Sequence, residues 1–267
     1  MGLFDVHAHL THPGLLADIE GVVSRASAAG LTSIVSNGLN PSDNAAVLEL
    51  ARRYPIVKPA LGLYPVDAVL AEMNAAGETY PGQREVYPTH EAIAWLRDHV
   101  EQAFAVGEIG LDGYWVKEPF WPAQDDAFRA LVRIAMDADK AIIIHTRKRE
   151  RRTFELLKEL GAKRVDWHCF GGRLTLAREI AAHGHYLSIP ANVRRSESFT
   201  RMLETLPRDR LLLETDSPYL GPEKDAPSEP AHVRGTAAFA AQLWNTSEAA
   251  AADQLASNFE ALFGVAP

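Results

Sequence analysis

The feature that most constrains the fold is a regular alternation of short apolar runs with longer amphipathic segments. Eight runs rich in apolar and β-branched residues occupy positions 3–7, 32–36, 57–63, 104–111, 141–145, 164–168, 186–189 and 211–215. Between them, stretches such as 15–30, 127–140 and 153–163 place apolar residues three and four positions apart, which is typical of amphipathic helices. A strand followed by a helix, repeated along the chain, predicts a parallel sheet.

The number of strands indicates how this sheet is arranged. Eight strand–helix units close naturally into a (β/α)8 TIM-type barrel, a fold of about 250 residues, and the chain has 267. A doubly wound open sheet would show the same alternation, but the strand count favours the barrel. We therefore predict an α/β fold with one barrel domain over residues 1–267.

Two segments exceed a minimal barrel. Residues 64–102 include the turn-rich stretch YPGQREVYP (80–88) and the helical pattern THEAIAWLRDHV (89–100). We interpret them as an elaborated loop after the third strand, above the barrel mouth. From residue 231 onward the pattern predicts two closing helices, the second running from near Ser247 to Gly264.

The composition excludes some classes of function. A net charge of -8 argues against broad coating of nucleic acid, which needs many phosphate contacts from Lys and Arg, but it allows a local basic pocket. The single cysteine, Cys169, excludes an intramolecular disulfide and fits a reducing compartment. No apolar run approaches the roughly 20 residues that span a bilayer, and the first residues do not resemble a signal peptide. We expect a soluble, cytoplasmic monomer.

Polar side chains gather at the carboxyl ends of the predicted strands, the face at which enzymes of this barrel place their chemistry. These residues are His7, His9, Glu108, His145, His168 and Asp216. Each alone could be a hydrogen-bonded histidine at a core edge or a carboxylate in a turn. Together they would form a crowded, repulsive cluster unless a cation lay among them, so the set predicts a metal site.

The residue types narrow the choice of metal. Imidazole with carboxylate suits Zn, Mn, Fe, Ni or Co better than Ca, which prefers oxygen ligands. Six ligands are too many for one tetrahedral ion with an open position, but they divide well between two. A carboxylate can bridge ions about 3.5–4 Å apart, and such pairs serve the hydrolysis of phosphate esters and amides. We predict two divalent ions and leave their identity open among Zn, Mn and Mg.

The motifs FDVHAHL, GEIGLD, IIIHTR, WHCFGG and LLETDSPYL, with the ending SNFEALFG, resemble the TatD family of metal-dependent hydrolases and deoxyribonucleases, within the amidohydrolase superfamily. The resemblance implies a (β/α)8 barrel and a bridging role for Glu108. It implies one metal held by His7, His9, Glu108 and Asp216, and a second held by Glu108, His145 and His168.

The chain departs from the family pattern at two positions. Many members carry a histidine in a GxHP segment where this chain reads GLYP, with Tyr64, and an NEP-like segment where it reads SEP (228–230). Neither change touches a predicted ligand, and both lie where a substrate would be held. We therefore predict Tyr64 as a substrate contact.

The same residues suggest a mechanism. A hydroxide held between the metals would be the nucleophile, with Asp216 as the general base that takes its proton. Beyond the ligands, the run TRKRERR (146–152) is mostly a solvated, helix-starting charge run. Arg147 is the exception, because it matches an arginine of the family two residues after a ligand, and we predict that it contacts phosphate. Arg194 and Arg195 are weaker candidates on the same face.

Three functions remain open. The first is a phosphodiesterase or deoxyribonuclease acting on nucleic-acid ends, or on a smaller phosphate ester, which Arg147 favours. The second is an acyl hydrolase that uses the same metals on an amide, a lactone or an aminoacyl ester, which Tyr64 favours. The third is a binding protein that has lost its activity, which the complete ligand set disfavours.

Overall fold

The structure, a computed structural model, describes residues 2–82 and 85–267. Eight parallel strands follow one another around a single sheet in the order β1 to β8. They are β1 (Leu3–Ala8), β2 (Leu31–Asn37), β3 (Val57–Leu61), β4 (Ala105–Asp112), β5 (Ala141–Arg147), β6 (Val165–Trp167), β7 (Tyr186–Ile189) and β8 (Leu211–Leu213). All eight predicted strands are confirmed, and their ends differ from the prediction by at most two residues.

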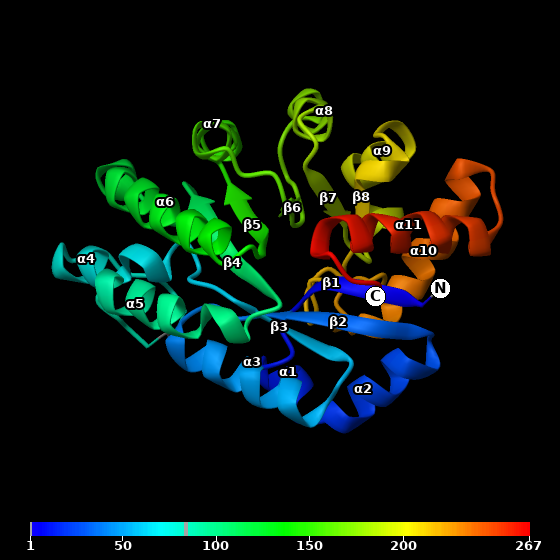
Figure 1. Ribbon diagram of the computed structural model, residues 1–267, viewed down its shortest axis with the longest axis horizontal. Helices are drawn as coiled ribbons and strands as arrows, with labels where there is room; N and C mark the ends of the chain where they lie inside the picture. The colour runs from blue at the N-terminus through cyan, green and yellow to red at the C-terminus, as the bar shows by residue number, and fades with distance from the viewer. Residues whose placement is uncertain (1, 83–84) are drawn as a thin grey trace.

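The sheet closes into a barrel where the chain leaves β8 and meets β1. The backbone N–H of Asp216 donates to the carbonyl of His7 at 2.8 Å, and the N–H of His9 donates to the carbonyl of Ser217 at the same distance. Helices surround the strands on all sides (Figure 1). The predicted TIM-type barrel is therefore confirmed, and its closing hydrogen bonds involve three of the predicted metal ligands.

Some of the helices begin or end where the sequence supplies a cap. The side chain of Asn40 accepts the N–H of Asp43 at the start of α3, and Ser247 accepts that of Ala250 at the start of α11. Gly264 ends α11 with a left-handed φ of 81°. The helices are α1 (Pro13–Leu16), α2 (Ile19–Ala28), α3 (Pro41–Arg53), α4 (Leu70–Ala75), α5 (Thr89–His99), α6 (Trp121–Asp137), α7 (Glu150–Leu160), α8 (Leu174–Ala182), α9 (Glu197–Thr205), α10 (Val233–Trp244) and α11 (Glu248–Phe263).

The amino-terminal end of the barrel is packed with aromatic side chains. Phe4, near the start of β1, lies 4.8 Å from Phe259 of α11, measured between ring centroids. Phe263 extends this cluster, 4.9 Å from Phe104 and 4.5 Å from Phe259. Each buried ring of this size contributes about 2–3 kcal/mol through the removal of apolar surface from water. The closing helix α11 thus covers the end of the barrel opposite its mouth.

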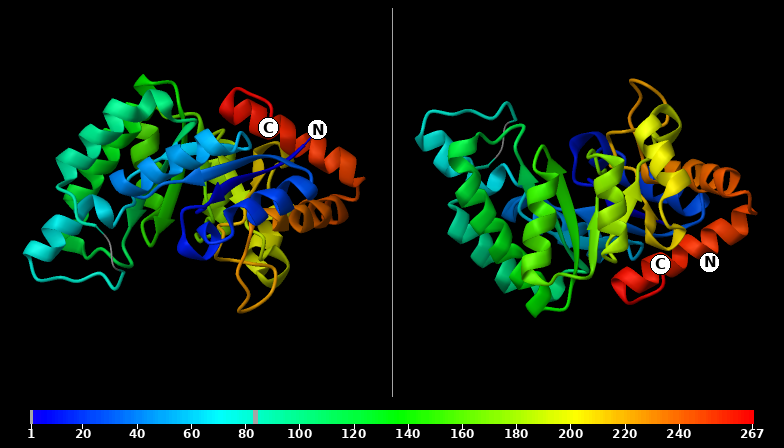
Figure 2. Two further views of the ribbon diagram at one scale, coloured as in Figure 1. Left: turned by 90° about the horizontal axis from the view of Figure 1, so that it is seen from below. Right: turned by 90° about the horizontal axis from the view of Figure 1, so that it is seen from above.

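The long connection between β3 and β4 carries α4 and α5, as the elaborated-loop interpretation requires. Two residues of its turn-rich stretch, Gln83 and Arg84, lie outside the described residues. This connection and the loop after β8 extend from one side of the molecule, while the chain termini lie on the other side (Figure 2). Among the described residues, no helix is both long and apolar enough to cross a membrane.

Candidate metal centre

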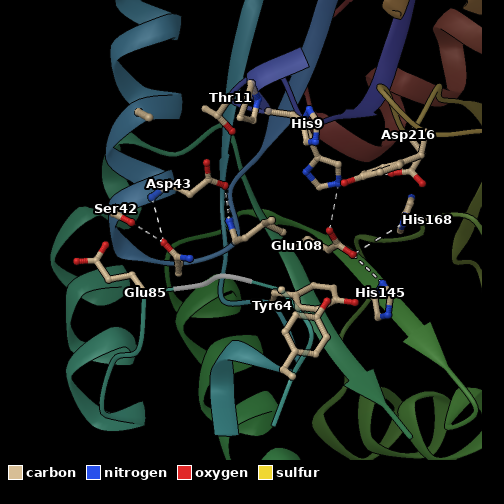
Figure 3. A pocket seen from close by; sticks show the side chains of 18 of the residues that line it. His9, Thr11, Ser42, Asp43, Tyr64, Glu85, Glu108, His145, His168 and Asp216 are labelled. Atoms are coloured by element: carbon tan, nitrogen blue, oxygen red, sulfur yellow. Dashed lines mark hydrogen bonds and ion pairs between the residues drawn. The ribbon is translucent and has the colours of Figure 1, made fainter. Parts of the chain in front are cut away.

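The structure brings all six predicted ligands to one place at the barrel mouth. Three of them lie within strands: His7 in β1, Glu108 in β4 and His145 in β5. The others directly follow strands: His9 after β1, His168 after β6 and Asp216 soon after β8. Five line a cavity of about 1000 Å³, and fully buried His7 lies beneath its wall. Figure 3 shows these five side chains converging from separate segments of the chain.

Glu108 lies at the centre of the cluster, with each carboxylate oxygen facing a different group of imidazoles. Its Oε2 lies 3.5 Å from His7 Nε2 and 3.6 Å from His9 Nε2. Its Oε1 lies 2.7 Å from His145 Nδ1 and 3.8 Å from His168 Nε2. This is the arrangement that a bridging carboxylate needs. The backbone beside it is tightly packed, because a Cβ on Gly62 would overlap the amide nitrogen of Glu108.

Asp216 completes the cluster on the side of β1 and β8. Its Oδ1 lies 3.4 Å from His9 Nε2 and 3.8 Å from His7 Nε2. The backbone of Asp216 is in the left-handed region, with φ of 52°, a conformation that non-glycine residues adopt rarely and often at functional sites. Ligand atoms within 4.8 Å of one another define two overlapping groups, His7–His9–Asp216 and His7–Glu108–His168.

Hydrogen bonds orient three imidazoles so that one nitrogen of each faces the cluster. His9 donates from Nδ1 to the carbonyl of Asn37 at 3.2 Å, and His168 donates from Nδ1 to Glu214 at 3.0 Å. His145 donates from Nε2 to Asp112 at 3.2 Å, which leaves its Nδ1 toward Glu108. Metal-ligating histidines are held in this way, because the outer hydrogen bond fixes the tautomer.

The electrostatics of the cluster favour a bound cation. Burial disfavours the charged form of His168, yet the carboxylates of Glu214, Asp216 and Glu108 raise its pKa to about 10. Burial raises the pKa of Glu108, but hydrogen bonds from His145 and His7 bring it well below its usual value. These shifts show that the buried carboxylates demand compensating positive charge.

The donor atoms themselves fit a divalent metal. His7 Nε2 and His9 Nε2 face each other at 3.3 Å, where one shared proton can satisfy only a single hydrogen bond. The buried Nδ1 of His7 has no hydrogen-bond partner among the described residues. Imidazole nitrogens and carboxylate oxygens are the ligands that Zn and Mn accept. The residues present therefore suit the metal ions that the sequence predicts.

The sequence interpretation missed Glu214, a buried carboxylate that holds His168. Glu214 accepts hydrogen bonds from His168 Nδ1, from the amide of Cys169 at 2.9 Å and from Ser188 Oγ at 2.7 Å. Behind it, Ser188 contacts Asp166, whose pKa burial raises to about 8. The signal was available, because Glu214 lies within the predicted strand 211–215, two residues before Asp216.

A second carboxylate that the sequence interpretation missed, Asp112, holds His145. Asp112 is fully buried, and its Oδ2 faces His145 Nε2. Its Oδ1 accepts the backbone N–H groups of Tyr114 at 2.7 Å and Trp115 at 2.8 Å. One carboxylate thus fixes both a predicted ligand and the loop that follows β4. Its position four residues after Glu108 on the same strand was the available signal.

Asp5, which shares a strand face with His7 and His9 in the sequence pattern, serves a structural role. Its Oδ1 accepts the N–H groups of Thr215 at 3.0 Å and His7 at 3.1 Å, and its Oδ2 accepts the Thr215 hydroxyl. Burial raises the pKa of Asp5 well above its usual value. Asp5 therefore ties β1 to the segment that carries Asp216.

The predicted substrate contacts separate into two groups. Arg147 and Tyr64 line the cavity, and the ring of Tyr64 lies 4.9 Å from that of His145. Arg194 does not line it, because its guanidinium lies over the ring of Phe239, 4.2 Å from the centroid. The structure thus does not bring Arg194 to the ligands, and its contact with substrate stays a prediction.

The basic run 146–152 is largely committed to ion pairs. Arg149 pairs with Asp125 at 2.9 Å, Arg151 with Glu179 at 2.6 Å and Arg152 with Asp125 at 2.8 Å. Within the described part of the chain, Arg147 makes no ion pair, and its guanidinium stacks 3.6 Å from the centroid of Tyr114. The run leads into α7 as expected, but Arg149 is buried rather than solvated, and Arg147 stands apart from the paired arginines.

Comparison with known proteins adds independent evidence. The family model described as "TatD related DNase" matches residues 4–264. "Uncharacterized metal-dependent hydrolase YabD" of Bacillus subtilis is 33% identical, covering 90% of this chain and 91% of its own. "3'-5' ssDNA/RNA exonuclease TatD" of Escherichia fergusonii is 30% identical, covering 98% and 99%. The crystal structure of the TatD homologue YjjV from Escherichia coli superposes with a TM-score of 0.83 at 25% identity, covering 98% of both chains.

The closed barrel, its cluster of imidazoles and carboxylates, and these relatives define a metal-dependent hydrolase. Within that class, the chain belongs to the TatD-related DNase family. The sequence resemblance is therefore confirmed across nearly the whole chain.

Proposed function

We propose that the protein is a metal-dependent phosphodiesterase that acts on the ends of nucleic acids. The observation that carries this proposal is the position of Glu108, whose two oxygens face separate groups of imidazoles. Relatives named as a metal-dependent hydrolase and as a single-stranded DNA and RNA exonuclease support it. Arg147, held in the cavity wall without an ion pair among the described residues, supports a phosphate substrate.

The site residues are proposed to hold two divalent ions, which can be Zn, Mn or Mg. His7, His9, Glu108 and Asp216 would hold one, and Glu108, His145 and His168 the other. When bound, such ions lower the pKa of water in the site and stabilise negative charge on the attacked phosphoryl group. Among the described residues, four carboxylates line the cavity and would otherwise repel an anionic substrate: Asp43, Glu85, Glu108 and Asp216.

Asp216 and Arg147 have distinct proposed roles on opposite sides of Glu108. The carboxylate of Asp216, with 15% of its side chain exposed, faces the cavity and would take a proton from the attacking water. Arg147 would bind the non-bridging phosphate oxygens through its planar guanidinium. Tyr64, which lies against the ring of His145, would limit the position of the bound ester.

A second candidate is the hydrolysis of an acyl substrate by the same centre. The charges of the cavity lining favour this candidate. Among the described residues, the cavity is lined by four carboxylates but by a single Lys or Arg side chain, that of Arg147. A neutral lactone, amide or aminoacyl ester would meet less repulsion there than a polyanion would.

The proposal is tested by digestion of end-labelled single-stranded DNA with added Mn²⁺. Wild-type protein is expected to release label, and Asp216→Asn is expected to lose about 10²–10⁴-fold in rate through loss of the general base and of a ligand. Asp209→Asn, on an exposed carboxylate outside the cavity, is the matched control. Intact DNA with every metal, together with hydrolysis of lactones or esters, would establish the acyl candidate instead.

A further inference from the structure

Two tyrosines at the barrel mouth have an exposure that packing does not explain. In the described part of the chain, Tyr114 and Tyr219 are the large aromatic side chains that remain exposed, at 52% and 53%. Tyr219 lines the cavity, and Tyr114 lies against Arg147, which also lines it. Exposed aromatic rings that gather at a ligand cavity are typical of a binding surface.

The two rings lie on opposite sides of the metal centre. Tyr219 follows β8, which meets β1, and its ring lies 6.3 Å from that of His9. Tyr114 follows β4, beside β5 and its ligand His145. In a closed ring of eight strands, β4 is half-way around from β8. Glu108 and the other ligands therefore lie between the two tyrosines.

Both tyrosines belong to backbone that hydrogen bonds fix in place. The N–H of Tyr219 donates to the carbonyl of Asp216 at 2.8 Å, and the ring of His12 lies 5.7 Å away. The N–H of Tyr114 donates to Asp112, the carboxylate that orients His145. Each ring is thus positioned relative to a metal ligand, as a preformed subsite requires.

The ring of Tyr114 also contacts a cation, the guanidinium of Arg147. The guanidinium of Arg147 lies 3.6 Å from the centroid of its ring, close enough for a cation–π interaction that limits the movement of the arginine. A ring that stacks on a base, next to a guanidinium that binds phosphate, matches the two halves of a nucleotide. The Tyr219 side offers aromatic surface from Tyr219 and His12.

We propose that Tyr219 and Tyr114 are base-stacking platforms on the two sides of the scissile phosphate. The inference rests on the proposed nuclease function and names the residues that would hold the bases of an unpaired nucleic-acid end of at least two nucleotides. Stacking on aromatic side chains needs bases that are free of their own duplex stack, and it tolerates any sequence because every base has a π face. A blunt duplex or a small phosphate ester could not occupy both platforms.

The test compares how each variant treats substrates with and without bases. The measured quantity is the ratio of kcat/KM for a single-stranded tetranucleotide to kcat/KM for methyl p-nitrophenyl phosphate. Tyr219→Ala and Tyr114→Ala are expected to lower this ratio by about tenfold to a hundredfold, the loss of one stacked base. Tyr219→Phe, which keeps the ring, should retain it. Met136→Ala, which removes an exposed apolar side chain near the end of α6, is the matched control.

A change in the substrate tests the same point without a change in the protein. Tetranucleotides with an abasic residue at either of the last two positions should lose a similar factor with wild-type protein, and the loss at one of these positions should disappear in Tyr219→Ala. Blunt duplexes should be degraded more slowly than single strands. If wild-type protein degrades DNA but abasic residues and both tyrosine variants leave the ratio unchanged, the stacking inference is wrong while the nuclease function stands. If wild-type protein degrades no oligonucleotide, the proposed function fails first.

Discussion

His168 and His145 are both held by a buried carboxylate, but the two carboxylates are connected to different parts of the molecule. Glu214, which holds His168, is joined through Ser188 to Asp166 inside the barrel. Asp112, which holds His145, is joined to the backbone of the loop that carries Tyr114 and Trp115. His168 is therefore anchored to the core, and His145 is coupled to the loop that carries Tyr114, the proposed base-stacking residue.

This difference predicts that substitutions on the His168 side and on the His145 side of the centre impair different properties of the protein. A change on the His168 side should weaken metal binding and the fold together, since its supports are buried strand residues. A change on the His145 side should weaken metal binding and substrate binding together, since Asp112 fixes both. The comparison thus gives separate expectations for two carboxylates that do similar work.

The largest effect is expected for Glu214→Gln. The amide offers one acceptor where the carboxylate serves three donors, so His168 loses its orientation and a buried hydrogen bond is left unmade. Metal affinity should fall by about 10–100-fold, the usual cost of losing such a partner. Competition with a fluorescent chelator measures this, and thermal unfolding of the metal-free protein should show a lowered Tm. An unchanged Tm with weakened metal binding would contradict the anchoring of this side to the core.

The next largest effect is on the pH dependence of folding stability, and it arises from His185, on the buried side of His168. His185 accepts a hydrogen bond from Trp167, the residue before His168, and burial lowers the pKa of His185 to about 4. In the unfolded chain the pKa of His185 is about 6.5. Between about pH 6.5 and pH 4 the unfolded chain therefore binds a proton that the folded chain does not, so the free energy of unfolding falls as the pH falls. From pH 7 to pH 5 the contribution amounts to about 2 kcal/mol.

Denaturant titrations of wild type and His185→Gln at several pH values measure this contribution. The glutamine carbonyl can still accept from Trp167 but does not titrate. The stability advantage of wild type over the variant should therefore shrink by about 2 kcal/mol between pH 7 and pH 5. Parallel curves for the two proteins would show that His185 does not stay neutral in the fold.

Asp112→Asn is expected to have a double effect. The single amide oxygen of asparagine can accept from Tyr114 or from His145, but not from both. The negative charge beside His145 is also lost. We expect about a tenfold loss in metal affinity and, at saturating metal, a higher KM for oligonucleotides. Glu214→Gln at saturating metal should leave that KM nearer to the wild-type value. A KM that changes equally in both variants would remove the distinction between the two sides.

The smallest effect is expected for Arg147→Lys. Lysine keeps the charge but loses the planar stacking on Tyr114 and the paired hydrogen bonds to phosphate. The KM for oligonucleotides should rise by several-fold to about tenfold, with metal affinity close to that of wild type. Arg151→Lys, in an exposed ion pair with Glu179, is the matched control. A loss of metal affinity in Arg147→Lys would place the arginine in the support of His145 instead.

Much of the fold, and the convergence of the candidate site residues, could be predicted from the sequence for a simple physical reason. Strand and helix periodicities differ, so eight strands were identifiable, and parallel strands bring their carboxyl ends to one rim. His7, His145 and the other predicted ligands therefore converge although they are far apart along the chain. The resemblance to a known family added the assignment of Glu108 as the bridge.

The parts that could not be predicted depend on depth and on loop conformation. The sequence places Glu214 two residues before Asp216 and Asp112 four residues after Glu108, but it does not say which carboxylate reaches the cavity and which lies behind a histidine. Arg194 follows β7 on the expected face, yet its side chain lies over Phe239 of α10. Tyr114 and Tyr219 lie in loops, where no periodicity indicates the direction of a side chain.

The most direct test of the two-ion centre is the number of metal ions bound per chain. Equilibrium dialysis against Mn²⁺ or Zn²⁺, followed by elemental analysis, should give two ions for wild type and for His90→Ala, which removes an exposed imidazole outside the cavity. Glu108→Ala, which removes the carboxylate between the two groups of imidazoles, should bind at most one ion under the same conditions. One ion in wild type, or two ions retained in Glu108→Ala, would contradict the bridged centre.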